Sequence, residues 1–284
     1  MNVLSLFDGM SCGQIALNRA GVKYDSYFAS EIDKPAIKVT MANYPNTIQL
    51  GDVTKVKGAD LPKIDLLIGG SPCQGFSFAG KQLNFNDPRS KLFFEYVRLL
   101  RECNPKYFLL ENVKMKKEYQ DIISEHLGVE PIFINSALVS AQNRKRLYWT
   151  NIPINTMPED KGLTLKDIIS DVAHHKITIK HPETVRRTKN YAQYDQTLKG
   201  HGSQDQRFFY LNGKSGCITR SRSSIPKVEY GDEIILLLPE EVEKLQTVPT
   251  GYTSIVKTQD RYAMLGNGWT VDVIAHIFKG IKET

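Results

Sequence analysis

The sequence predicts an α/β fold, in which a doubly wound, mostly parallel sheet is accompanied by a smaller second domain. Short apolar runs alternate with helical patterns through the first half of the chain, and each run is bounded by glycine or an acidic residue. From about Pro153 this alternation fades into polar, glycine- and serine-containing segments. Strands separated by helices form parallel sheets covered on both faces, so the first half should be one such layered domain.

The expected elements follow one another in a regular order. Apolar, strand-like runs occur at 2–7, 26–32, 47–53, 65–70, 107–113, 132–139 and 146–152. Patterns with helical spacing lie between them at 12–21, 34–44 and 90–103. Two further helices are expected near the end: 238–248, which has acidic residues in its first turn, and the amphipathic segment 269–281. The last helix is expected to return to the large domain.

Composition bounds the class of protein. The 284 residues are 41% hydrophobic and 24% charged, as in ordinary globular proteins. No apolar run approaches the ~20 residues of a membrane helix, and the N-terminus has no basic leader, so we expect a cytoplasmic protein without a membrane partner. The cysteines are scattered without CxxC pairs, which indicates neither a disulfide framework nor a metal site.

Positive charge gathers in one region. The formal net charge is +6, and nine basic residues lie between Arg186 and Lys227, opposed only by Asp195 and Asp205. Five aromatic residues are interleaved with them: Tyr191, Tyr194, Phe208, Phe209 and Tyr210. A nucleic-acid surface and an ordinary solvated face explain this pattern about equally well.

Glycine and acidic residues follow the first three strands. Ligands of open α/β sheets collect at the carboxyl ends of the strands. The first run ends in the turn Phe7 to Gly13, and Glu31 follows about 20 residues later, where an acid can accept hydrogen bonds from ribose hydroxyls. Asp52 could accept from an adenine amino group. With Asp8 in the first loop, the site suits a cationic cofactor such as S-adenosylmethionine better than a pyrophosphate.

The same edge of the sheet carries reactive side chains. Cys73 follows the fourth strand behind a proline, Glu111 ends the fifth, and Arg144 and Arg146 follow. Carbon C5 of cytosine is a poor nucleophile, and addition of a thiolate at C6 turns it into part of an enamine. Nearby arginines would favour the thiolate, and an acid at N3 would accept the charge that enters the ring. These residues therefore predict methylation of a cytosine that is rotated out of the duplex.

The motifs resemble those of the DNA (cytosine-5) methyltransferases over most of the chain. FDGMSCG, SEID, GDV, GGSPCQGFS, ENV, QNRKRLYW, LPEEVEKLQTVPTGYT and RYAMLGNGWTVDVIAHIF occur in the family's order. Within the family the chain is most similar to the catalytic domain of the animal de novo branch. Without an appended chromatin-reading domain it resembles a stand-alone module of the kind found in bacteria or their viruses.

The resemblance implies a fold, a cofactor and a set of site residues. It implies the S-adenosylmethionine-dependent methyltransferase fold and double-stranded DNA as substrate. Cys73 would be the nucleophile, Glu111 the partner of N3, and Arg144 and Arg146 the arginines beside the ring and the phosphate. The residues expected around S-adenosylmethionine are Phe7, Asp8, Gly9, Met10, Ser11, Cys12, Glu31, Ile32, Asp52, Val53, Pro72, Leu92, Asn267, Gly268 and Trp269.

The resemblance also implies three segments: 1–154 for catalysis and cofactor binding, 155–253 for target recognition, and 254–284 returning to the catalytic domain. The chain departs from the family at Ser11-Cys12, where many bacterial relatives have a second GxG glycine, and at Gly268, where serine or alanine is usual. Three alternatives stay open: a tRNA cytosine-5 methyltransferase, a non-catalytic DNA-binding relative, and a nucleotide-dependent oxidoreductase. The chain could be a monomer or a homodimer.

Overall fold

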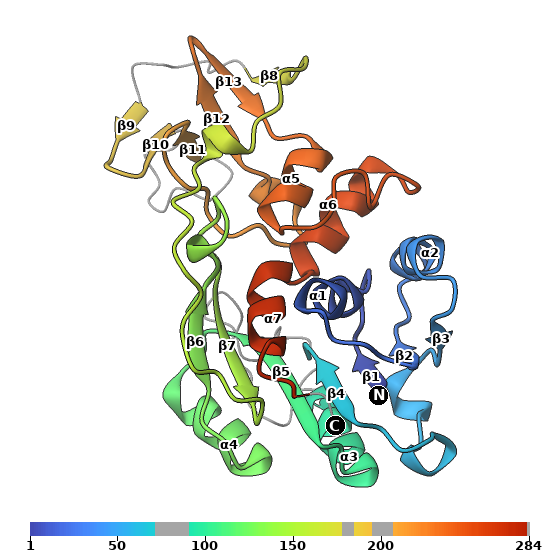
Figure 1. The fold of residues 1–284 in the computed structure, drawn as a ribbon. Helices are drawn as coiled ribbons and strands as arrows, with labels where there is room; N and C mark the ends of the chain where they lie inside the picture. Colours follow the sequence, from blue (N-terminus) through green and yellow to red (C-terminus); the bar gives the residue numbers. More distant parts are fainter. Residues whose placement is uncertain (72–90, 178–184, 195–206, 283–284) are drawn as a thin grey trace. The chain divides into compact units, whose positions relative to one another are not determined.

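The computed structural model describes residues 1–71, 91–177, 185–194 and 207–282, which form two compact units (Figure 1). The first unit comprises Met1–Ile134, Lys145–Met157 and Val271–Thr284, and the second comprises Asn135–Arg144 and Pro158–Thr270. These bounds differ from the expected segments 1–154, 155–253 and 254–284, whose functional assignment stays a prediction.

The first unit is built on a seven-stranded sheet. Its order is β3-β2-β1-β4-β5-β7-β6, with β1 Asn2–Leu6, β2 Ser26–Ser30, β3 Ile48–Gln49, β4 Leu66–Gly69, β5 Tyr107–Val113, β6 Ile132–Asn135 and β7 Lys145–Thr150. The strands from β3 to β5 are parallel, and β7 runs antiparallel to β5. The prediction of a mostly parallel α/β sheet is thus confirmed.

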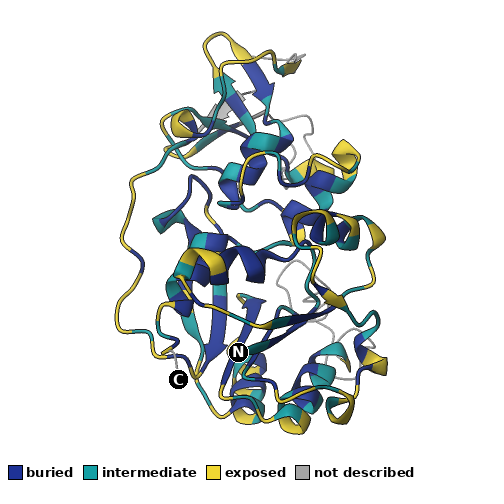
Figure 2. Ribbon diagram, turned by 45° about the vertical axis from the view of Figure 1, so that its right-hand side comes forward, coloured by how far each residue is buried: buried dark blue, intermediate teal, exposed yellow. Residues whose placement is uncertain are grey.

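Helices cover both faces of this sheet (Figure 1). They are α1 Cys12–Ala20, α2 Lys34–Asn43, α3 Lys91–Cys103, α4 Lys117–Leu127 and α7 Val271–Phe278. Side chains alternate between the faces of a strand, and the buried Leu4 and Leu6 join Phe93 and Tyr96 of α3 in one core cluster. On the opposite face α1 comes so close to β4 that a Cβ at Gly13 would lie 2.5 Å from Ile68 Cδ1. Figure 2 shows the resulting pattern, with buried strands between helices whose outer faces are exposed.

The register of the sheet brings the predicted site residues to one edge. Leu6 at the end of β1 pairs with Ser30 of β2 and with Gly69 of β4, and Gly69 pairs with Leu110 of β5. The next residue along each of these four strands is therefore level with the others: Phe7, Glu31, Gly70 and Glu111. Strand β1 is also the point from which the chain winds in both directions, which is where open α/β sheets bind their ligands.

The second unit contains a six-stranded sheet and two helices. The strand order is β8-β13-β12-β11-β10-β9, with β8 His175–Ile177, β9 Val185–Arg187, β10 Tyr191–Tyr194, β11 Arg207–Tyr210, β12 Lys227–Tyr230 and β13 Glu233–Leu236. Among the strand pairs that the structure describes in this sheet, only β11 and β12 are parallel. Helices α5 Pro239–Leu245 and α6 Thr258–Asn267 follow. Across both units, short 3₁₀ turns lie at Val53–Lys55, Gly58–Asp60, Ser136–Leu138, Leu165–Asp167 and Arg222–Ser224.

No helix in the described part of the chain has the length and apolar character needed to cross a membrane.

Candidate active site

The loop after β1 is held in an unusual backbone conformation. Phe7, Gly9 and Ser11 have φ angles of 57°, 61° and 64°, in the left-handed region that favours glycine. The amide of Asp8 donates to the carbonyl of Ser30, and the amide of Ser11 donates to the carbonyl of Asp8. Strained, non-glycine residues of this kind are concentrated at ligand sites, because the surrounding structure must hold them. The loop therefore has the character of a preformed binding element.

A carboxyl group of this loop is poorly satisfied. The hydroxyl of Tyr27 donates to Asp8 Oδ1 at 2.7 Å, whereas Oδ2 is buried without a hydrogen-bond partner. Burial raises the pKa of Asp8 from 3.8 to about 6, partly offset by hydrogen bonds from neighbouring hydroxyls. Tyr27 has no place among the residues predicted from the sequence, because only the fold brings it beside Asp8. The unsatisfied oxygen marks a position where a polar or cationic ligand group would be stabilised.

Glu31 organises the loop through backbone amides. Its Oε2 accepts from the amide of Gly9 at 2.7 Å, and its Oε1 accepts from the amides of Ile32 and Asp33 at 2.7 and 2.9 Å. The carboxylate therefore ties the end of β2 to the loop after β1. Ile32 points outward with 73% of its surface exposed, so an apolar side chain stands free beside the anchored carboxylate.

The remaining predicted cofactor residues of this unit fall into two groups. Asp52 is accessible at the end of β3, where its Oδ1 accepts from the amide and hydroxyl of Thr54, and these bonds lower its pKa. In contrast, Met10, Cys12 and Val53 are buried in the core. Leu92, on α3, is partly buried against the core cluster. Because these side chains are buried, they can support the shape of the site, but only their backbone groups could contact a ligand.

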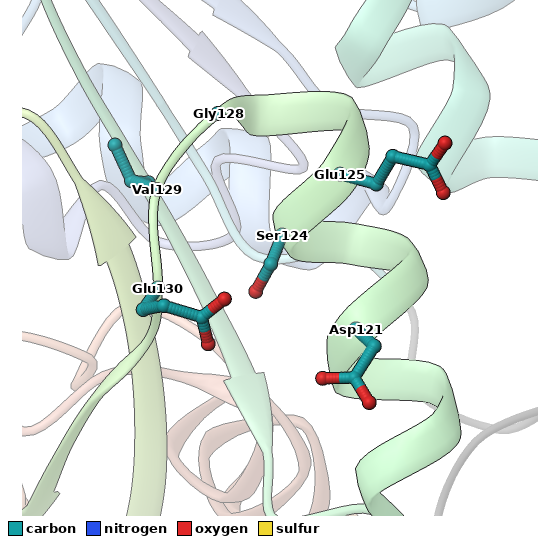
Figure 3. A pocket seen from close by; sticks show the side chains of 6 residues that line it. All are labelled: Asp121, Ser124, Glu125, Gly128, Val129 and Glu130. Atoms are coloured by element: carbon teal, nitrogen blue, oxygen red, sulfur yellow. The ribbon is translucent and has the colours of Figure 1, made fainter.

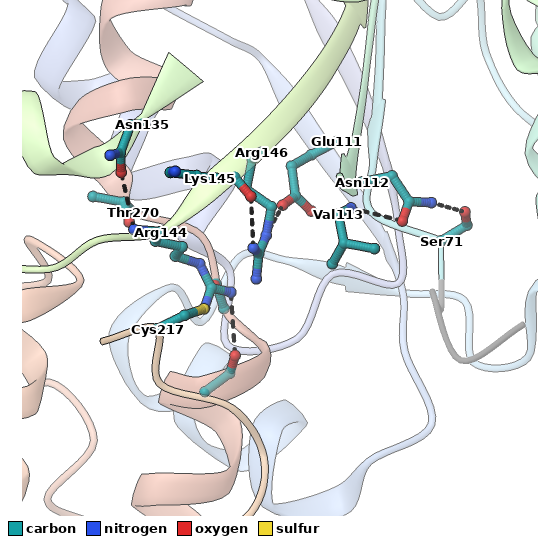
Figure 4. A network of polar contacts seen from close by, with 12 residues as sticks. Ser71, Glu111, Asn112, Val113, Asn135, Arg144, Lys145, Arg146, Cys217 and Thr270 are labelled. Atoms are coloured by element: carbon teal, nitrogen blue, oxygen red, sulfur yellow. Dashed lines mark hydrogen bonds and ion pairs between the residues drawn. The ribbon is translucent and has the colours of Figure 1, made fainter. Parts of the chain in front are cut away.

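Glu111 and Arg146 form an ion pair at the end of β5. Arg146 Nε lies 2.8 Å from Glu111 Oε1, and 13% and 11% of the two side chains is exposed (Figure 4). The antiparallel pairing of β5 with β7 dictates this contact, because Val113 lies opposite Arg146. Two residues that are 35 positions apart in the sequence are thus in contact, and their roles at the cytosine ring stay a prediction.

The neighbouring Asn112 connects β5 to the segment after β4. Its Nδ2 donates to Ser71 Oγ at 3.2 Å, and its Oδ1 accepts from the amide of Val113 at 2.8 Å (Figure 4). Ser71 lies two residues before Cys73. Cys73 and Pro72 themselves lie outside the described residues. The motif ENV already contains Asn112, but its contact with Ser71 depends on the pairing of β4 and β5.

Arg144 belongs to a buried network in the second unit. Its Nη1 donates to the carbonyl of Ile218 at 2.8 Å, while Nη2 donates to the carbonyls of Gly266 and Gly268. Nη1 also lies 3.4 Å from Sγ of Cys217, which is drawn beside Arg144 in Figure 4. Only 3% of Arg144 is exposed. These hydrogen bonds show that the guanidinium of Arg144 holds the backbone of the second unit together. The predicted contact of Arg144 with the cytosine ring stays a prediction.

The same network holds the segment predicted to lie near the cofactor. Gln246 Nε2 donates to the carbonyls of Leu265 and Gly268, and its Oε1 accepts from the hydroxyl of Thr270. The predicted cofactor residues Asn267, Gly268 and Trp269 lie in the segment between Leu265 and Thr270 that these bonds hold. The side chain of Asn267 is exposed. Their part in cofactor binding stays a prediction.

A separate hollow in the first unit does not coincide with the candidate active site. It measures about 320 Å³ and lies at the C-terminal end of α4, lined by Asp121, Ser124, Glu125, Gly128, Val129 and Glu130 (Figure 3). A helix that follows a parallel strand ends at the amino edge of the sheet, opposite the ligand edge. Two of its acids, Asp121 and Glu130, pair with Lys117. We assign no function to this hollow.

A doubly wound sheet whose switch point carries a strained loop and anchored carboxylates is the arrangement at which open α/β sheets bind their ligands. The chain belongs to the C-5 cytosine-specific DNA methylase family, whose model matches residues 1–283. This match confirms the predicted family and the enzyme class, DNA (cytosine-5) methyltransferase.

Individual relatives agree with the family. The chain is 31% identical over 309 residues to the type II methyltransferase M1.ScrFI of Lactococcus lactis subsp. cremoris, covering 99% of this chain and 78% of that protein. It is 37% identical to the orphan methyltransferase M.Rho11sI of Bacillus phage rho11s over 60% of this chain and 37% of that protein. The solved structure of the Entamoeba histolytica methyltransferase EhMeth matches with a TM-score of 0.77 at 17% identity, covering 100% of this chain and 99% of that one, which supports the fold. The special likeness to the animal branch stays a prediction.

Proposed function

We propose that this chain transfers a methyl group from S-adenosylmethionine to C5 of a cytosine that has been rotated out of double-stranded DNA. The observation that carries the proposal is the register of the sheet. It makes Phe7, Glu31, Gly70 and Glu111 level at one edge, and Gly70 leads within three residues to Cys73. A cofactor loop, a nucleophile and an acid are thus expected at the same edge.

The residues of the first unit fit S-adenosylmethionine. The buried, unpartnered Oδ2 of Asp8 would be stabilised by a cationic ligand. Glu31 has further lone pairs for ribose hydroxyls, and the exposed Ile32 offers an apolar surface for adenine. Asp52 would accept from the adenine amino group through its accessible carboxylate. When bound, the cofactor supplies an electrophilic methyl group.

The protein's own residues would activate the cytosine. The Cys73 thiolate would form a bond to C6, and the displaced electron pair would move through the ring toward N3 and O2. Glu111, after taking up a proton from solvent, would donate it to N3 and recover it when the ring regains its aromaticity, and Arg146, already within 2.8 Å of Glu111, would donate a hydrogen bond to O2. After C5 has accepted the methyl group, its proton leaves to a base, the C6–S bond breaks, and the thiolate is restored.

The ion pair of Glu111 and Arg146 would position both groups before the base arrives. Each charged side chain holds the other in a site that is largely shielded from water, so little reorganisation is needed. The hydrogen bond from Asn112 to Ser71 would in turn fix the segment that leads to Cys73. Asn112 is therefore a positioning residue in this proposal.

The first experiment compares methyl transfer by the unaltered chain and by Cys73→Ala, using duplex DNA and radiolabelled S-adenosylmethionine. We expect transfer by the unaltered chain and none by the variant. Cys103→Ala, which removes a half-buried cysteine at the end of α3, is the matched control and should remain active. Full activity of Cys73→Ala would contradict the assigned nucleophile.

A second experiment traps the covalent step. Duplex DNA with 5-fluorocytosine at the methylated position cannot lose its C5 substituent and should remain bonded to Cys73 under denaturing conditions. Offering tRNA as the acceptor in parallel tests the alternative substrate: preferential methylation of tRNA would replace DNA in the proposal.

A further inference from the structure

The second unit contains a cavity of about 180 Å³ between strands β10 and β11 and the segment that leads to Ile225. This volume is below the roughly 300 Å³ of pockets for drug-sized ligands, so a small ring system is the appropriate size. Every described residue that lines it belongs to the second unit, so the geometry of these residues does not depend on the first unit.

Two aromatic rings and a guanidinium form one wall. Tyr191 and Phe209 lie opposite each other in neighbouring strands, with ring centroids 6.2 Å apart and an edge-on arrangement. The guanidinium carbon of Arg207 lies 4.7 Å from the centroid of the Tyr191 ring. All three side chains are only partly buried, so their flat surfaces are not consumed by the core. Such surfaces stack with planar ligands.

The backbone keeps the second ring in place. A Cβ at Gly216 would lie 3.2 Å from Phe209 Cζ, closer than an ordinary contact, so the ring rests directly against the chain. Gly216 thus lets the segment after β11 approach the ring and close this side of the cavity. The wall is preformed in the protein.

The polar rim is positive and amide-rich. Lys214 Nζ donates to the carbonyls of Ala137 and Ser140 at 2.6 and 3.1 Å, which leaves one of its three N–H groups for another acceptor. Asn143 and Asn190 are exposed at the rim, and their amides can both donate and accept. None of the described residues that line the cavity carries a carboxylate. The ligand should therefore be planar, rich in hydrogen-bonding edges, and attached to negative charge.

We propose that this cavity binds an unstacked nucleobase of the DNA other than the target cytosine, with Tyr191, Phe209 and Arg207 as stacking surfaces and the asparagine amides reading the edge of the base. This inference rests on the proposed DNA methyltransferase function. Unstacked bases are recognised in this way, by aromatic and guanidinium planes combined with hydrogen bonds to their edges. A site for the phosphate backbone alone would need the two cations, but not two aromatic rings.

The test begins with the sequence that the full chain methylates, identified by bisulfite sequencing of DNA from cells that express it. A fluorescently labelled duplex of that sequence is then made in a series in which each position in turn is an abasic site. Dissociation constants are measured for the unaltered chain, Tyr191→Ala, Arg207→Lys and the conservative Tyr191→Phe. Tyr230→Ala removes an exposed tyrosine of β12 outside the cavity and is the matched control.

We expect one position at which loss of the base weakens binding to the unaltered chain about tenfold. Tyr191→Ala should bind the intact duplex about tenfold more weakly than the unaltered chain does. Its affinity should not fall further when the base at that position is absent. Arg207→Lys keeps the positive charge but removes the planar guanidinium, and it should show the same pattern. This variant therefore tests the proposal even if Tyr191→Ala does not fold. Tyr191→Phe and Tyr230→Ala should behave like the unaltered chain.

If Tyr191→Ala weakens binding to every duplex equally and Arg207→Lys binds like the unaltered chain, the region contacts phosphate only and the proposal is overturned. Unchanged affinities in all variants would overturn it as well. Methylation of the intact duplex is measured beside binding. If bisulfite sequencing finds no methylated cytosine, the proposed function fails. If the duplex is methylated but no abasic position couples to the cavity variants, only the cavity proposal fails.

Discussion

Replacing Asp8 by asparagine should make the protein more stable at neutral pH and leave its stability at pH 4 nearly unchanged. The carboxyl oxygen Oδ2 is buried without a partner, and the pKa of Asp8 is raised from 3.8 to about 6. Between these two values the folded state binds more protons than the unfolded state, so stability falls as the pH rises from about 4 to about 6. Asparagine carries no charge and escapes this loss.

The size of the effect follows from the pKa values. A difference between 3.8 and about 6 corresponds to roughly 3 kcal/mol at pH values above 6. The hydroxyl of Tyr27 can still donate to the amide oxygen of asparagine, so the packing should be preserved. The quantity to compare is the difference in free energy of unfolding between the variant and the unaltered protein, because other titrating groups contribute equally to both.

The assay is urea denaturation at five pH values from 4 to 8. We expect the difference to grow with pH and to level off above about 6. Asp52→Asn is the matched control of opposite sign, because hydrogen bonds from Thr54 lower the pKa of that accessible carboxylate. A constant difference for Asp8→Asn across this range would refute the assignment of a buried, destabilising charge.

The gain in stability should carry a loss of binding. A charge that is costly in the free protein becomes favourable beside a cationic ligand, so Asp8→Asn should bind S-adenosylmethionine more weakly at pH 7.5 by isothermal titration calorimetry. An unchanged dissociation constant would place the cofactor's charge elsewhere.

Three further substitutions test the second unit, each by urea denaturation at pH 7.5. Gly266→Ala should cost about 1–3 kcal/mol, because its Cβ would lie 2.0 Å from the carbonyl oxygen of Thr219; no change would mean that this segment can shift freely. Arg144→Met should cost about 1–3 kcal/mol by removing the hydrogen bonds of a buried guanidinium to three carbonyls, of which Gly268 keeps its bond from Gln246, and no loss would show that water replaces the guanidinium. Glu243→Gln should cost about 3–5 kcal/mol, because the fully buried carboxylate accepts from Arg261 and from backbone amides; a neutral result would contradict the importance of this pair.

The sequence predicted the large sheet well because its signals are local. Strand β5 occupies 107–113 as expected, and the apolar runs for β1 and β4 were found within two residues. Strand β3 is only Ile48–Gln49, shorter than the expected 47–53, since it pairs on one side alone at the end of the sheet. Helix α4 was not predicted, although Tyr119, Ile123 and Leu127 are spaced four residues apart and are buried.

The second sheet escaped prediction for a different reason. Its strands are only three or four residues long, and β8 pairs with β13 across more than 50 residues of chain. Pairing of this kind is set by tertiary contacts and leaves little periodicity in the sequence. The partners of Asp8 and Arg144 are of the same nature, since Tyr27 and Gly268 are recognisable only once the chain has folded.

The last helix of the first unit has a consequence for how the protein is made. Helix α7 buries Val271, Ile274 and Ile277 and packs beside α1, where Arg19 pairs with Asp272. During synthesis this helix leaves the ribosome only after all of the second unit, so the apolar surface beside α1 that it covers stays exposed until then. The nascent chain should therefore depend on chaperones until those final residues arrive.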